Sequence, residues 1–466
     1  QTSMWTNTQS KTIGGAAAAL LLAGAGILLT GDTAFTQSTT NCRTVDDVDK
    51  QVCVVSGSIT SDTTWDNDSY WVLRGAVFVD SPARLTIDAG TEIFGEFATN
   101  GTLIIARGAR ILANGTAGAP IVFSSDQPIG ERGRSDWGGL IINGRAPINV
   151  PGGEAVGEGD TGTYGGSDAA DDSGHLRYVR VEFAGTEFSP DNELNGIAFQ
   201  GVGSNTEVDH VMVKYNKDDG LEFFGGTVEV KHVVLQGIAD DSVDWTDGWT
   251  GKGQFIIVMQ SGDDADQGIE ADNNGDNNNL TPRSNPTLYN LTLIGDPDTD
   301  EGSESDIGML LREGTSATIR NFIVLGFKEA SIDIDHTATY DQVDNGSLTL
   351  ASGIIHNNCS VSGCDGQFRP DSDDNARTGD EEATKEFVTN SDNVSFVDPL
   401  LADPYDLSDP DYRPAATSPA LNGTVTAAMP PMNDTFIETA NFIGAVGPSG
   451  SGKDTWWQGW TDFATN

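Results

Sequence analysis

Short apolar runs recur along the chain at nearly equal intervals. The runs at residues 85–87, 103–105, 121–123 and 140–142 begin 18, 18 and 19 residues apart, and Gly-rich or Asn-rich turns separate them. No helical period is sustained in this region, so we expect the runs to be strands. Strands of three to five residues repeated about every twenty residues are typical of a β-solenoid rather than a sandwich.

A clearer strand pattern follows, in which the residues read apolar-x-x-apolar-x-apolar. Its copies begin at Leu176, Val208, Val230, Leu288 and Ile319. The residue before the second apolar position carries a polar group in every copy: Tyr178, His210, His232, Asn290 and Asn321. A polar residue kept at one position, where the strand must bend, predicts a hydrogen-bonded ladder along the coil. We therefore interpret His210 and His232 as ladder members rather than as ligands or catalytic bases.

An acidic sequence is repeated between these strands. Residues 217–222 (KDDGLE) are echoed by 239–244 (ADDSVD) and more loosely by 265–270 (ADQGIE). If the repeats stack, Glu222, Asp244 and Glu270 form a column on one wall, continued after Leu310 by Asp333. Two charges about 5 Å apart repel by about 3 kcal/mol at an effective dielectric near 20. The column therefore needs a bound cation, a cationic partner, or a proton held through a raised pKa.

Three interpretations of this acidic face remain open. Calcium prefers carboxylate oxygens, and the candidate ligands are Asp218, Asp219, Asp240, Asp241, Asp244, Asp247, Glu270 and Asp272. A shared proton would instead make an acid–base pair for glycoside hydrolysis, either Glu222 with Asp244 or Asp241 with Asp244. In the third interpretation the carboxylates project into water and bind nothing.

Neighbouring residues could hold a substrate. Phe224, Trp245 and Trp249 are aromatic side chains that could offer a flat apolar surface to sugar rings. Arg312 is a lone candidate for contacting substrate, or it neutralises the column. The sequence lacks the His-Gly and Arg-x-Lys combination that we would expect of a polygalacturonase, and it has no convincing basic cluster of the pectate-lyase kind.

Residues 136–144 (DWGGLIING) and 216–226 (NKDDGLEFFGG) resemble exported bacterial right-handed parallel β-helix proteins of the pectate-lyase-like family, most of which have no assigned role. The resemblance covers about residues 70–358 and implies a fold but no catalytic residue. We expect an all-β protein, a right-handed parallel β-helix (β-solenoid) with N- and C-terminal caps. Its divisions are a signal peptide or anchor (1–36), an N-terminal cap (37–75), the β-helix (76–360) and a C-terminal extension that packs on the helix (361–466). Within the extension, Trp456, Trp457 and Trp460 are expected to plug a coil end.

Composition and charge bear on location and partners. The formal net charge of −45 argues against nucleic acid, because phosphates would be repelled. Residues 13–29 form an apolar run after Lys11, the shape of a secretory signal, with a retained membrane anchor as the alternative. Cys42 with Cys53, and Cys359 with Cys364, are expected to form two local disulfides, which fits an exported protein.

A phosphate-binding loop is rejected at residues 447–453, because Asp454 stands where Ser or Thr should bind magnesium. We expect no nucleotide or organic cofactor, and Ca²⁺ as the possible ion. The expected function is binding of polysaccharide or matrix outside the cell or at its surface. The alternatives are a polysaccharide hydrolase or lyase acting on the acidic face, and a purely structural surface spacer. Contact with a membrane is expected only through the possible N-terminal anchor.

Overall fold

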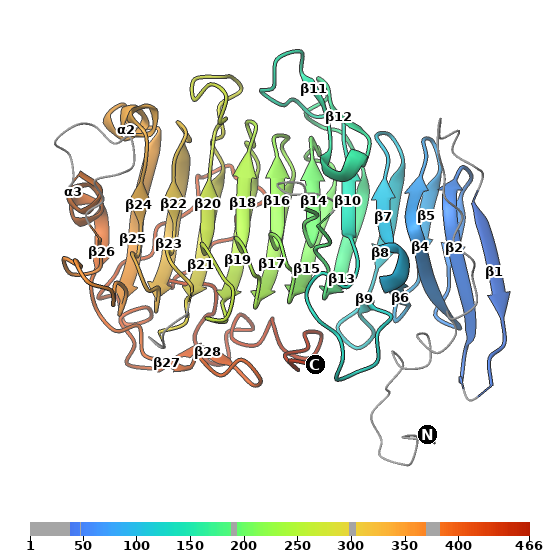
Figure 1. Ribbon diagram of the computed structural model, residues 1–466. Coiled ribbons are helices and arrows are strands. Elements are labelled where there is room, and N and C mark those ends of the chain that lie inside the picture. The colour runs from blue at the N-terminus through green and yellow to red at the C-terminus, as the bar shows by residue number, and fades with distance from the viewer. Residues whose placement is uncertain (1–37, 47, 188–192, 298–303, 370–382) are drawn as a thin grey trace.

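The computed structural model describes residues 38–46, 48–187, 193–297, 304–369 and 383–466, and it shows a long sheet wound into a tube (Figure 1). Within these residues the sheet contains 24 strands, nearly all of them paired in parallel with the strand of the next coil. This confirms the expected right-handed parallel β-helix. In this part of the chain no helix is both long enough and apolar enough to cross a membrane. The predicted signal peptide or anchor, residues 1–36, lies outside the described residues.

The first coils begin close to the described N-terminus. β1 (Thr39–Arg43) pairs antiparallel with β2 (Gln51–Ile59), and β2 then pairs in parallel with β4 (Ser69–Val79). The following strands and one 3-10 turn complete the first coils: β3 (Thr63–Trp65), β5 (Arg84–Ile87), β6 (Glu92–Gly95), η1 (Phe97–Thr99), β7 (Thr102–Ile105), β8 (Arg110–Asn114), β9 (Ile121–Ser125) and β10 (Gly139–Asn143).

From residue 174 each coil consists of one long bent strand and one short strand. The long strands are β13 (Gly174–Glu182), β15 (Glu207–Lys214), β17 (Glu229–Gln236), β19 (Lys252–Met259), β21 (Thr287–Ile294), β23 (Ala317–Leu325) and β25 (Leu348–His356). The short strands are β14 (Ile197–Gln200), β16 (Leu221–Phe224), β18 (Val243–Thr246), β20 (Ile269–Ala271), β22 (Leu310–Leu311) and β24 (Asp333–Ile334). Apolar residues alternate inward along these strands and fill the tube.

The long strands bend at one residue whose backbone is left-handed. This residue is Tyr178, His210, His232, Phe255, Asn290, Asn321 or Ser352, with φ between 50° and 59°. The rings of the first four members stack, with centroids 4.3, 4.3 and 5.1 Å apart in order. The predicted repetition of one residue at the bend is therefore confirmed, but its rings stack instead of forming a hydrogen-bonded ladder. Asn290 donates to the carbonyls of Phe442 and Gly444, and Asn321 donates to that of Ala428. Sequence analysis missed Phe255, because an aromatic residue there carries no polar signal.

Two smaller sets of elements lie outside the coils. One is an excursion between β10 and β13, with β11 (Glu154–Val156), η2 (Glu158–Asp160) and β12 (Thr163–Gly165). The other consists of α2 (Thr337–Asp344) between β24 and β25, and of α3 (Ala383–Asn390), β27 (Leu401–Asp403) and β28 (Asp411–Pro414) after β25. Between α3 and β27, β26 (Asp392–Ser395) pairs in parallel with β25 and belongs to the main sheet.

The C-terminal segment (residues 396–466) runs back along the side of the tube (Figure 1). Met212, Val234 and Ile257 point outward from the long strands and pack against residues such as Tyr412 and Trp456. The expectation that the three tryptophans plug a coil end is therefore wrong. The outward side chains of this sheet are apolar, so a lateral cover is what burial requires.

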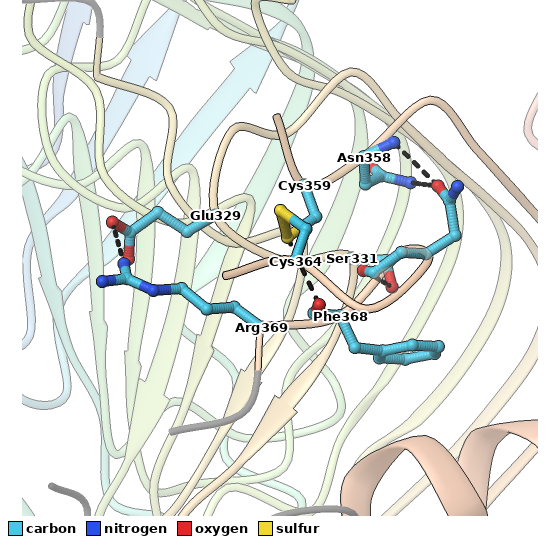
Figure 2. The surroundings of a disulfide bond; sticks show 8 residues. Glu329, Ser331, Asn358, Cys359, Cys364, Phe368 and Arg369 are labelled. Atoms are coloured by element: carbon cyan, nitrogen blue, oxygen red, sulfur yellow. Dashed lines mark hydrogen bonds and ion pairs between the residues drawn. A yellow bond between two sulfur atoms is a disulfide. The ribbon is translucent and has the colours of Figure 1, made fainter. Parts of the chain in front are cut away.

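Both predicted disulfides are present, Cys42–Cys53 and Cys359–Cys364, and none of the four cysteines is free. Figure 2 shows how the second one lies against the last coils. Beside it, Asn358 donates its backbone N–H and its Nδ2 to the side chain of Gln367, at 2.7 and 3.1 Å. Ser331 Oγ donates to the Gln367 carbonyl at 2.9 Å. These hydrogen bonds hold the disulfide loop against the C-terminal end of the tube.

Candidate functional site

An acidic wall is formed by the sheet of short strands. Glu222 on β16 pairs in register with Asp244 on β18, and Asp244 pairs with Glu270 on β20. Leu310 and then Asp333 continue the row. The carboxylates are thus neighbours along one wall, as the repeated sequence predicts.

The same alternation that turns these carboxylates outward turns the neighbouring strand residues, including Trp245, inward, and Trp249 beyond the end of β18 is buried as well. Trp245 and Trp249 are 0% exposed, and Trp249 stacks on Phe223 with ring centroids 4.0 Å apart. The expectation that these tryptophans bind sugar is wrong, because both rings lie inside the tube. Phe224 points outward, but Ile148 and Tyr164 of the excursion pack over it and leave it 9% exposed. It is not an open platform for a sugar ring either.

The turns before the short strands are joined by side chains. Asp219 Oδ1 accepts the backbone N–H of Asp241 at 3.1 Å, and Asp241 Oδ1 accepts that of Gln267 at 2.7 Å. Gln267 Oε1 in turn accepts the N–H of Ile307 at 3.0 Å. Asp219 and Asp241 therefore connect successive coils through one oxygen each, a structural role that the sequence did not reveal.

Several carboxylates of the turns and strands converge. Among the described residues, three groups of carboxylates each bring one oxygen per residue within 4.8 Å of one another. They are Asp218 with Asp219 and Asp240, Asp219 with Glu222 and Asp244, and Asp240 with Asp241 and Asp266. The groups share members, so they form one continuous acidic cluster. Six of the predicted calcium ligands or catalytic residues, namely Asp218, Asp219, Glu222, Asp240, Asp241 and Asp244, lie in it.

Burial and mutual repulsion raise the pKa values of the cluster. Burial first, and neighbouring carboxylates second, raise the pKa of Asp219, Glu222, Asp241 and Asp244 well above the ordinary range. The same causes raise the pKa of Asp218 to about 8. At neutral pH the cluster is therefore stable only with protons or a cation among its oxygens.

The remaining predicted ligands have partners within the chain. Arg312 Nε donates to both oxygens of Asp272 at 2.9 and 3.2 Å, and its Nη2 pairs with Glu270. Asp247 lies beyond the other end of β18, where it accepts hydrogen bonds from Asn274 Nδ2 at 2.8 Å and from the Tyr164 hydroxyl at 3.5 Å. Asp247 is thus separate from the cluster. Arg312 neutralises the part of the column that contains Glu270.

Other residues of the site were missed by sequence analysis. Asn195, aligned with Asp219 in the preceding turn, donates its Nδ2 to Glu222. A polar hollow of about 320 Å³ borders the cluster and is lined by Glu193, Lys217, Ala239, Asp240, Ala265, Asp266, Glu304 and Asp306. Asp266 could have been found, because it occupies an acidic position of the third repeat. Glu158 on η2 adds to the charge around Glu222, but no pattern in the sequence marks it.

The functional groups of this wall are carboxylates, and they set the chemistry that it can support. They can ligate a hard cation, or a pair of them can hold and transfer one proton. The wall's one neighbouring guanidinium, among the residues described, is already paired with Glu270 and Asp272.

Comparison with protein families gives one match. A family model described as a pectate-lyase-like beta-helix domain matches residues 57–394. Neither the curated proteins nor the solved structures give a match to this sequence.

Proposed function

We propose that this chain, which belongs to the pectate-lyase-like β-helix family, binds polysaccharide outside the cell or at its surface and holds Ca²⁺ on the acidic wall. The fold of this family points to a polysaccharide-related function. Two disulfides fit an oxidising compartment. The apolar run at residues 13–29 fits export.

The observation that carries this proposal is the convergence of Asp219, Glu222 and Asp244. One oxygen from each lies within 4.8 Å of the other two, and Ca²⁺ surrounds itself with six to eight oxygens at about 2.3–2.6 Å. Small movements of the side chains would bring these oxygens to one ion. A cation also removes the repulsion that raises the pKa of all three carboxyl groups.

The direction of the wall supports a chain-like ligand. Successive coils repeat about every 4.8 Å, so a glycan lying along the tube axis would meet equivalent positions on several coils. Without a cation the wall repels uronic acids, because both partners are anionic. Binding of an acidic glycan is therefore expected to require Ca²⁺, whereas binding of a neutral glycan would not.

The experiment is a glycan array probed with the purified chain, once with millimolar Ca²⁺ and once with a chelator. We expect binding in Ca²⁺ that weakens at least tenfold in Glu222→Gln and Asp244→Asn. The matched control is Asp68→Asn, because Asp68 is an exposed carboxylate in a turn that is far in sequence from the acidic wall. This variant should bind as the wild type does. Equal binding by wild type and both wall variants would overturn the assignment of the site. No binding to any glycan would favour the structural spacer.

A second function is favoured by the relationship between Glu222 and Asp244. Retaining glycosidases place two carboxyl groups about 5 Å apart, one of them with a raised pKa. Incubation with neutral and acidic polysaccharides, followed by assays for reducing ends and for unsaturated products, tests this alternative. Activity that disappears in Glu222→Gln would establish a hydrolase or lyase. Activity that survives both wall variants would place catalysis elsewhere on the molecule.

A further inference from the structure

A second cluster of ligand-type side chains lies on another sheet, near the covering C-terminal segment. Asp209 and His210 are consecutive residues of β15, and His232 is on β17 of the next coil. One ligand atom from each residue lies within 4.8 Å of the other two, and both imidazole Nδ1 atoms face Asp209 Oδ1. The ladder explains why the two rings stack. It does not explain why both Nδ1 atoms face the same carboxylate oxygen.

The separations within this cluster are those of atoms that can share an ion. His232 Nδ1 is 2.7 Å and His210 Nδ1 is 3.0 Å from Asp209 Oδ1. Tetrahedral sites with bonds of about 2.0–2.1 Å place neighbouring ligand atoms about 3.3 Å apart. Hydrogen bonding alone accounts for only part of the arrangement. It satisfies His232, but the buried Nδ1 of His210 approaches the oxygen without hydrogen-bond alignment and has no hydrogen-bond partner among the residues that the structure describes.

The cations beside Asp209 do not pair with it. Arg177 and Lys231 are its register partners on the two neighbouring strands. Arg177 pairs instead with Glu207 at 3.0 Å, and Lys231 pairs with Glu438 at 3.1 Å. The Asp209 carboxylate is thus left to the two imidazoles.

The rings are held in place from several sides. Tyr178 stacks on His210 and Phe255 stacks on His232, with centroids 4.3 and 5.1 Å apart. The ring of Trp456, in the C-terminal segment, lies 5.0 Å from that of His232. Packing on both sides therefore fixes the two rings with their Nδ1 atoms facing Asp209 Oδ1.

The cluster is also accessible. Asp209 lines a hollow of about 270 Å³ together with Glu207, Glu229, Lys231 and Phe436, among others. The side chain of Asp209 is 24% exposed, and those of His210 and His232 are 14% and 9% exposed. An ion could enter from this side, and a water molecule or another ligand could complete its coordination there.

We propose that Asp209, His210 and His232 form a site for a divalent transition-metal ion, with Zn²⁺ as the reference ion. Two imidazole nitrogens and one carboxylate oxygen are a ligand set typical of zinc sites that keep a fourth position open. The site uses none of the acidic-wall residues. The ion would link two coils directly beneath the C-terminal segment.

The test is titration of the chelator-treated full chain with Zn²⁺ by calorimetry, supported by the visible spectrum of the Co²⁺ form. We expect one site whose affinity falls at least tenfold in the double variant His210→Asn, His232→Asn. This variant should fold, because Asn290 and Asn321 occupy the same ladder position with φ of 58° and 56°. His356→Asn is the matched control, because His356 also faces a carboxylate, Asp398, at 3.9 Å.

Two measurements keep the test decisive. Glu222→Gln should leave the Zn²⁺ titration unchanged, which separates this site from the proposed calcium wall. X-ray absorption of the Zn²⁺-loaded wild type, which needs no variant, should show two imidazole ligands. Equal Zn²⁺ binding by the wild type and the double variant, or a coordination shell of oxygen alone, would overturn the proposal and leave the two histidines as members of the ladder only.

Discussion

Glu222 on β16 and Asp244 on β18 are direct register partners, and one carboxylate oxygen of Glu222 lies within 4.8 Å of one of Asp244. Glu222 is only 7% exposed. Two ionised carboxylates in such a place cost free energy, because burial and repulsion both oppose charge. The fold tolerates the pair only when a proton or a cation reduces that cost. This relationship leads to the first two predictions.

Calcium is expected to stabilise the protein through this wall. A site filled at a hundred times its dissociation constant adds about 2.7 kcal/mol to the free energy of unfolding. We therefore predict that millimolar Ca²⁺ raises the melting temperature by at least about 2 °C relative to chelator. Glu222→Gln and Asp244→Asn should lose most of this rise, and Asp68→Asn should keep it. An unchanged melting temperature in Ca²⁺ would remove calcium from the proposal.

The stability of the calcium-free protein is expected to fall as pH rises. Burial, followed by nearby carboxylates, raises the pKa of Asp218 to about 8 and of Asp266 to about 6. Their unfolded values are near 4, so between these limits the folded chain binds more protons than the unfolded chain. Stability is then greatest below the unfolded pKa and is lost as pH rises through the folded pKa.

Urea unfolding in chelator at pH 5, 6, 7 and 8 measures this effect. We expect the midpoint to decrease across the series and Ca²⁺ to flatten the decrease. Glu222→Gln should be more stable than wild type at pH 8 in chelator, because the amide can still accept the hydrogen bond from Asn195 without carrying charge. A midpoint that rises with pH would contradict the assignment of raised pKa values.

The positions of the carboxylates on the wall could be predicted, because the acidic sequence that carries them is short and repeated. Three copies of one acidic sequence, together with parallel stacking, are enough to place Glu222, Asp244 and Glu270 side by side. The inward direction of Trp245 follows from the same rule, because its neighbour Asp244 faces outward. Trp249 lies outside the strands, where alternation gives no direction.

The parts that could not be predicted depend on contacts between distant segments. The excursion that covers Phe224 has no repeat of its own. Gly225 allows its close approach, since a Cβ there would lie 2.6 Å from Ile148. The sequence does indicate that something covers the sheet of long strands, although it does not say which segment does so. Met212, Val234 and Ile257 interrupt the alternation of apolar and polar residues in their strands, which indicates a sheet covered on both faces.

Arg312 is predicted to stabilise the folded protein by neutralising the carboxylates of Glu270 and Asp272. It pairs with Glu270 and Asp272, and its own side chain is 31% exposed. Arg312→Gln leaves two carboxylates without their cation, which should lower the free energy of unfolding in chelator by about 1–3 kcal/mol. Ca²⁺ should restore part of this loss, because it can replace the missing charge. The measurement is urea unfolding with and without Ca²⁺.

The control for this variant is Arg84→Gln, a change at an exposed position of β5. It should alter the free energy of unfolding by no more than about 0.5 kcal/mol in either condition. If Arg312→Gln is as stable as Arg84→Gln in chelator, then the ion pairs contribute nothing measurable, and the column must be neutralised by protons alone.

Trp249 is predicted to act on stability and not on ligand binding. Its ring is fully buried and stacks on Phe223, so Trp249→Ala should lower the free energy of unfolding by about 3–5 kcal/mol. Glycan and Ca²⁺ binding by the folded fraction should remain as in wild type, because the ring does not reach the wall. Phe396→Ala, at an aromatic residue that is 42% exposed, is the control and should change little. A Trp249→Ala protein with unchanged stability but no glycan binding would mean that this ring faces the ligand, and the inward direction assigned to it would be wrong.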